Sequence, residues 1–110
     1  MLGTFQEEYA SVGIQLGARY DGSPIVVADG TAPPADDAFR YRPSACPGGR
    51  APHMWLRDRT SLFDTFGAGF TMLRLGGRGR STEPLEAAAA ARGVPFKVVD
   101  VDLPEARDLY

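Results

Sequence analysis

The sequence predicts a small α/β domain built around a strand–helix–strand unit. Three segments lead to this prediction: an apolar run at residues 70–75 (FTMLRL), an alanine-rich helical segment at residues 83–92 that Gly93 ends, and a second apolar run at residues 95–102. Strands joined through a helix of this length pair in parallel. With 110 residues, the chain has room for one small domain with one hydrophobic core.

The first part of the chain predicts a hairpin followed by a long loop. Ile14–Tyr20 and Ser23–Val27 are strand-like arms around Asp21-Gly22, a dipeptide that favours a tight turn. Pro24 indicates that the second arm lies at a sheet edge. Residues 28–52 are rich in proline and glycine, which predicts an irregular loop that wraps a surface or serves a partner.

The middle and the end of the chain predict three further short elements. Residues 53–56 (HMWL) are expected to form a short strand with a turn after it. Residues 60–67 (TSLFDTFG) predict about two helical turns, with Ser or Thr as the N-cap and the final glycine as the C-cap. Residues 104–110 (PEARDLY) predict a helix with Pro104 in its first turn, and residues 95–102 read as a strand buried on both faces.

Composition excludes several classes of protein. The chain carries 12 Lys+Arg and 14 Asp+Glu without a basic stripe, so it has no electrostatic footprint for nucleic acid. Its single cysteine, Cys46, leaves no internal disulfide, CxxC pair or cysteine-based zinc site. No apolar run approaches the ~20 residues that span a bilayer, and no signal peptide is recognisable. We therefore expect a cytoplasmic protein, and the Arg, Ala, Gly and Pro bias is typical of a GC-rich bacterial genome.

Aromatic residues supply the expected core. Trp55, Phe63, Phe66 and Phe70 are predicted to be buried, because aromatic side chains bury the largest areas. His53 is the only histidine, and a metal site needs more ligands than the chain offers it. We expect it to be a hydrogen-bonded structural residue.

The glycine loop at residues 76–84 (GGRGRSTEP) lies between a predicted strand and helix, where phosphate-binding and redox loops occur. Gly77-Arg78-Gly79 begins a G-x-G-x-x-G pattern, but Thr82 replaces the third glycine, and the loop contains no sulfur. We interpret it as a turn. Two alternatives stay open: a stand-alone binding module, and a single-thiol redox protein that uses Cys46.

Two longer motifs carry a family resemblance. YRPSACPGGRAPHMWL (Tyr41–Leu56) and SLFDTFGAGFTMLRL (Ser61–Leu75), with RGVP before the last strand, resemble the C-terminal domain of FAD-dependent aromatic-ring hydroxylases. These are class A flavoprotein monooxygenases, which include phenol hydroxylase-like enzymes and polyketide hydroxylases. The resemblance implies that residues 13–110 form this domain and that residues 1–12 are an N-terminal segment or linker.

The resemblance implies a thioredoxin-like fold that is redox-inactive, since CxxC is absent. It also implies a parent enzyme that uses FAD and NAD(P)H to hydroxylate an aromatic ring. The flavin and substrate sites would lie in N-terminal domains absent from this chain, and those domains would be its partners. We expect no catalytic, cofactor-binding or metal-binding residue and no catalysis by the isolated chain, which would act as a scaffold or association domain.

One edge of the strand at residues 70–75 is the candidate functional site. Family members continue into a terminal β-hairpin, whereas this sequence ends at Tyr110, so we expect the domain to be incomplete at its C-terminus. An apolar strand with an open edge is a template for association. The edge expected to self-associate comprises Phe70, Thr71, Met72, Leu73, Arg74 and Leu75.

Overall fold

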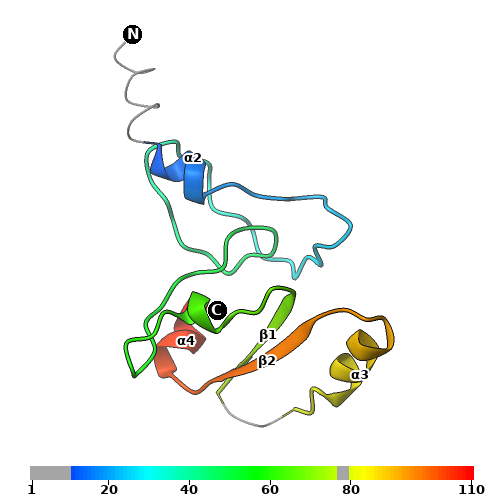
Figure 1. Ribbon diagram of the computed structural model, residues 1–110. Helices are drawn as coiled ribbons and strands as arrows, with labels where there is room; N and C mark the ends of the chain where they lie inside the picture. The colour runs from blue at the N-terminus through cyan, green and yellow to red at the C-terminus, as the bar shows by residue number, and fades with distance from the viewer. Residues whose placement is uncertain (1–10, 77–79) are drawn as a thin grey trace. The chain divides into compact units, whose positions relative to one another are not determined.

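The computed structural model describes residues 11–76 and 80–110. The chain divides after Pro52 into two compact units, one of residues up to Pro52 together with Tyr110, and one of His53–Leu109. The described elements, shown in Figure 1, are α2 (Val12–Leu16), the 3₁₀ helix η1 (Leu62–Thr65), β1 (Phe70–Leu75), α3 (Glu83–Ala91), β2 (Phe96–Val101) and α4 (Pro104–Leu109). The described residues therefore form a small α/β fold, as predicted.

β1 and β2 form a two-stranded parallel sheet, and α3 connects them (Figure 1). The register runs from Phe70 opposite Phe96 to Leu75 opposite Val101. This confirms the predicted strand–helix–strand unit, including the bounds of β1. The prediction that β2 is buried on both faces is wrong, because Lys97 is exposed and only Val101 is buried. A sheet of two described strands leaves too little neighbouring structure to cover both faces.

A Schellman motif ends α3, as Gly93 predicts. Gly93 has a φ of +64°, a conformation that favours glycine. Its N–H donates to Ala90 O at 3.1 Å, and Val94 N–H donates to Ala89 O at 2.9 Å. These two bonds satisfy carbonyl groups that the helix leaves unpaired, and they direct the chain into β2.

The core of the second unit is small and aliphatic. Leu62, Val101 and Ala106 are 0%, 2% and 0% exposed. Trp55 and Phe70 are 65% and 59% exposed, so the prediction that they form the core is wrong. Among the described residues β1 has a neighbouring strand on one side only, and Phe70 at its start therefore has little structure to pack against.

The hairpin predicted at residues 14–27 is absent, and the first unit contains helix α2 at this point. Gly13 explains the difference. Its N–H donates to Ala38 O at 3.1 Å, and Asp37 O would lie 1.6 Å from a β-carbon at this position. This close backbone approach, open only to glycine, overrides the weak strand propensity of the segment.

The predicted turn within that hairpin is confirmed. Asp21-Gly22 forms the turn, Ser23 N–H donates to Tyr20 O at 3.1 Å, and the φ of the glycine is +79°. Tyr20 N–H donates to Gly48 O at 2.7 Å. The Tyr20 N–H therefore pairs with the loop at residues 28–52 and is not free to pair with a second strand. That loop contains neither helix nor strand, as predicted.

The helix predicted at residues 60–67 is the shorter 3₁₀ helix η1. Ser61 is its N-cap, as predicted, with the side-chain Oγ accepting a hydrogen bond from Phe63 N–H at 3.2 Å. Phe66 is the C-cap in place of Gly67, so the element has four residues and not two α-helical turns.

Helix α4 begins at Pro104, as predicted, and it buries Ala106. The longest described helix, α3, has nine residues. None of the helices among residues 11–76 and 80–110 has the length and apolar character that crossing a membrane requires.

Candidate functional site

The edge of β1 is the predicted site, and hydrogen bonds to β2 show how its backbone groups point. Phe70 N–H donates to Pro95 O at 2.9 Å, and Gly76 N–H donates to Val101 O at 3.2 Å. Backbone groups of a strand alternate between its two sides. Three residues between these two positions therefore direct their N–H and C=O groups away from β2: Thr71, Leu73 and Leu75. Across residues 11–76 and 80–110, these outward groups have no backbone partner.

The side chains of β1 do not protect this edge. The strand contains no proline or lysine, which are common at edges that avoid pairing. Its one charged residue, Arg74, binds Asp100 of β2 through Nε and through Nη2, the latter 2.8 Å from Oδ2. This hydrogen bonding raises the pKa of Arg74. None of the six side chains of β1 is buried, so apolar surface accompanies the open backbone groups.

The glycine loop between β1 and α3 is described only in part, because residues 77–79 lie outside the described residues. At the start of α3, Thr82 Oγ1 donates to Glu86 Oε2 at 2.8 Å, and Glu83 N–H donates to Ser81 Oγ at 3.3 Å. Glu83 and Glu86 place negative charge in the first turn, where a bound phosphate would lie. These residues do not fit the pyrophosphate of FAD or NAD(P)H.

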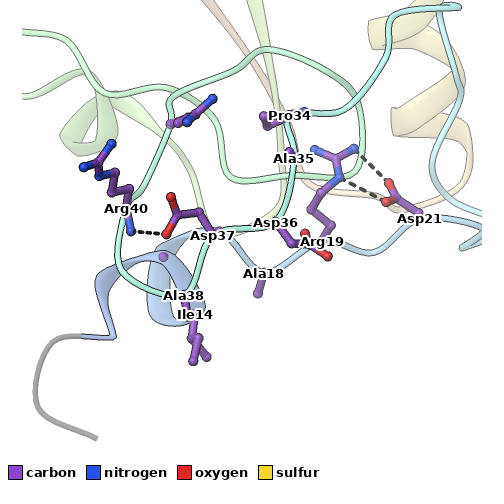
Figure 2. A pocket seen from close by; sticks show the side chains of 13 residues that line it. Ile14, Ala18, Arg19, Asp21, Pro34, Ala35, Asp36, Asp37, Ala38 and Arg40 are labelled. Atoms are coloured by element: carbon purple, nitrogen blue, oxygen red, sulfur yellow. Dashed lines mark hydrogen bonds and ion pairs between the residues drawn. The ribbon is translucent and has the colours of Figure 1, made fainter. Parts of the chain in front are cut away.

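A charged hollow of about 650 Å³ opens in the first unit. Figure 2 shows Arg19 paired with Asp21 on one side, with Nη2 and Oδ1 2.8 Å apart. On the other side Asp37 Oδ1 accepts the backbone N–H of Arg40 at 3.1 Å. The backbone N–H of Phe39, and then that of Arg40, lower the pKa of Asp37, and the hydrogen bond from Arg19 lowers the pKa of Asp21.

The chemistry of this hollow does not fit a flavin. Its lining contains no aromatic side chain, and Ile14 is its one large aliphatic residue, whereas cofactor pockets are mostly apolar. It contains no histidine or cysteine that could act as a base or nucleophile. This hollow was not predicted from the sequence. Its signal is the pair Asp36 and Asp37 followed closely by Arg40 and Arg42 in a loop.

Cys46 lies half-buried in the same unit and forms no disulfide. Its Sγ is 3.5 Å from Arg19 Nη2 and 3.5 Å from Thr31 O. The same guanidinium donates to Asp21 and, at 2.7 Å, to Pro47 O. Arg19, the cation beside the thiol, is thus already paired with Asp21. The environment of Cys46 therefore gives no specific support to a single-thiol redox protein.

His53 is hydrogen-bonded, as predicted. Its Nε2 lies 2.9 Å from Ser61 Oγ, and its ring packs edge-on against Trp55 and Phe63, with centroids 4.9 and 5.2 Å apart. The strand predicted at residues 53–56 is reduced to a single bridge between Trp55 and Ser61. The part of the chain that the structure describes has no group of three His, Cys, Asp or Glu side chains that could hold a metal.

Known proteins similar to the chain include flavin-dependent enzymes. It is 34% identical over 97 residues to the FAD-dependent monooxygenase apdD of Emericella nidulans. The aligned region covers 83% of this chain and 16% of apdD. It is 34% identical over 76 residues to the aklavinone 12-hydroxylase DnrF of Streptomyces peucetius, covering 66% of this chain and 15% of that protein. No protein-family model matches the sequence.

Solved structures of the rebeccamycin biosynthetic enzyme RebC are similar to the chain. With the form that holds reduced flavin, the TM-score is 0.74 and the identity 38%, over 96% of this chain and 19% of that chain. With the substrate-free form, the TM-score is 0.72 and the identity 37%, over 99% of this chain and 19% of that chain. The chain thus spans less than a fifth of the length of each of these relatives.

Proposed function

Because the chain is homologous to the C-terminal part of FAD-dependent monooxygenases, we propose that it is a non-catalytic scaffold and association domain of such an enzyme. The domain comprises residues 13–110 and has a thioredoxin-like fold. Its parent uses FAD and NAD(P)H to hydroxylate an aromatic ring in the cytoplasm. The flavin and substrate sites lie in N-terminal domains outside this chain, and these domains are its partners.

The observation that carries this proposal is the extent of the similarity. RebC matches 96% of this chain, while this chain matches only 19% of RebC. An alignment that covers nearly all of one chain and a small part of the other is expected when the first chain corresponds to one domain of the second. The name of DnrF, a hydroxylase, supports the proposed class of reaction for the parent enzyme.

The described residues support a role outside the chemistry. The first turn of α3 carries Glu83 and Glu86 at the helix end that a phosphate group would need, and the charged hollow offers no apolar slot for a flavin ring. The hollow contains no histidine or cysteine, and two of its carboxylates, Asp21 and Asp37, are already hydrogen-bonded by Arg19 and by backbone N–H groups. Among the described residues, the outward edge of β1 carries backbone groups that an associating strand could pair with.

A flavin titration tests the proposal on the chain as it exists. FAD fluorescence is followed as the purified chain is added, and NADPH consumption is measured with phenolic substrates. We expect no change in flavin fluorescence and no NADPH oxidation above buffer, while a full-length FAD-dependent monooxygenase shows both. Stoichiometric flavin binding or flavin-dependent NADPH oxidation by the isolated chain would refute the non-catalytic role.

A further inference from the structure

A second hollow lies within the second unit, between the segment that follows His53 and the start of α4. Its volume of about 350 Å³ is in the range of small-molecule sites. Four apolar and two charged residues line it: Met54, Trp55, Leu56, Leu103, Arg57 and Glu105. An apolar lining with few polar groups is the usual composition of a ligand site, and it distinguishes this hollow from the charged hollow of the first unit.

Trp55 gives the hollow an aromatic surface. It is the only tryptophan of the chain, and it is 65% exposed. A bridge to Ser61 holds its backbone, and the ring of His53 packs edge-on against its indole at 4.9 Å. These contacts fix the residue and leave most of its side chain uncovered. An exposed indole beside Met54 and Leu56 is a surface on which an aromatic ring can pack.

Arg57 brings a positive charge to the same hollow. Its Nη2 donates to Asp102 O at 3.3 Å, just before Leu103 lines the hollow. This is the one hydrogen bond of its side chain to the described residues, so other N–H groups of the guanidinium can bind a ligand. A guanidinium with paired N–H groups matches the two oxygen atoms of a carboxylate.

Glu105 brings a negative charge to the hollow from the first turn of α4. Within the described ranges it forms no ion pair with Arg57. The two opposite charges can therefore bind two different groups of one ligand. A ligand with a second negative charge would face Glu105, and one with a second positive charge would face Arg57, so both kinds are disfavoured.

We propose that this hollow binds a small aromatic zwitterion, the class to which free aromatic amino acids belong. The ring packs against Trp55, the carboxylate binds Arg57, and the ammonium group binds Glu105. This binding is a property of the present chain. It goes beyond the association role and does not depend on the flavin enzyme.

The fluorescence of Trp55 tests the proposal on the unchanged chain. L-Phenylalanine, which does not contribute to tryptophan fluorescence, is titrated into the purified protein, and a saturable change is expected. Three further probes each lack one group: 3-phenylpropanoate lacks the ammonium group, phenethylamine lacks the carboxylate, and glycine lacks the ring. Each should bind at least about tenfold more weakly, since it loses a charge-assisted hydrogen bond or the ring contact.

Charge-removing variants assign the two ends of the ligand. Arg57→Gln and Glu105→Gln should each weaken the binding of L-phenylalanine about tenfold. Glu83→Gln is the matched control, because Glu83 lies in the first turn of α3 and does not line the hollow. It should bind L-phenylalanine as tightly as the unchanged chain. If a variant fails to fold, the probe series on the unchanged chain decides the matter.

Three results would overturn the inference. They are a fluorescence signal that does not saturate with L-phenylalanine, equal affinity for the three incomplete probes, and folded Arg57 and Glu105 variants that bind as tightly as the control. None of them changes the expected outcome of the flavin titration. Failure of this binding site is therefore distinct from failure of the proposed function.

Discussion

Arg74 of β1 lies directly opposite Asp100 of β2 in the parallel register, and its guanidinium binds that carboxylate through two nitrogen atoms. The side chains are 22% and 52% exposed. This pair joins the two described strands on the side away from the open edge. It leaves the other side of β1 without a charge that would oppose strand pairing.

The orientation of this ion pair predicts a charge-swap rescue. Arg74→Glu places two carboxylates opposite each other, which should lower the thermal midpoint of unfolding, since like charges across a strand pair are destabilising. Adding Asp100→Arg should restore most of the loss. Circular dichroism melts of both variants measure it. A double variant no more stable than Arg74→Glu alone would show that the pair contributes nothing specific.

The small core predicts a large effect at Leu62, which is 0% exposed. Leu62→Ala should lower the free energy of unfolding by about 3 kcal/mol, through lost burial and a cavity. Phe70→Ala, at a residue 59% exposed in the single chain, should cost about 1 kcal/mol. Urea titration of the variants and the unchanged chain gives both values. A larger loss at Phe70 would mean that its ring packs against structure beyond the described residues.

The Schellman motif predicts the cost of replacing Gly93. No atom lies within 4 Å of a β-carbon at this position, so the substitution meets no steric obstacle, but its φ of +64° strains other residues. Gly93→Ala should lower the free energy of unfolding by about 1 kcal/mol, and Gly93→Asn should lower it less. Thermal melts compare the two. Equal stability of all three proteins would contradict the left-handed conformation.

Lowered carboxyl pKa values predict acid sensitivity. Four aspartates in turns or ion pairs have a pKa below the ordinary value of 3.8: Asp21, Asp29, Asp37 and Asp58. At intermediate pH the folded state binds fewer protons at these groups than the unfolded state does. The stability that they contribute to the folded state is therefore present above about pH 4, and it is lost as pH falls through their lower folded pKa values. Urea midpoints should therefore fall between pH 5 and pH 2. Asp37→Asn should show a smaller fall, and an unchanged fall would exclude Asp37 from the effect.

The second half of the chain could be predicted from sequence because its signals are local. The bounds of β1, the start of α3, its stop at Gly93 and the start of α4 at Pro104 all follow from strand periodicity and capping residues. The hairpin at residues 14–27 failed for the opposite reason. Contacts of Gly13 and Tyr20 with distant loop residues decide the conformation there, and no local pattern encodes them.

The position of strand β1 was predictable from the sequence, but the direction of its backbone groups was not. The apolar character of β1 indicates a strand, but only the hydrogen bonds to β2 show that Thr71, Leu73 and Leu75 face outward. The exposure of Trp55 and Phe70 could not be predicted either. The hydrophobicity of a side chain shows that its burial is favourable. It does not show whether the fold places other residues around that side chain.

A domain exchange with RebC tests the central claim most directly. The segment of RebC that aligns with this chain, 19% of that protein, is replaced by this chain, and the product is compared with RebC that lacks the segment. The proposal predicts that the exchanged enzyme retains bound flavin and turns over the substrate of RebC, whereas the shortened enzyme loses both. An exchanged enzyme that loses flavin or activity to the same extent as the shortened one would contradict it.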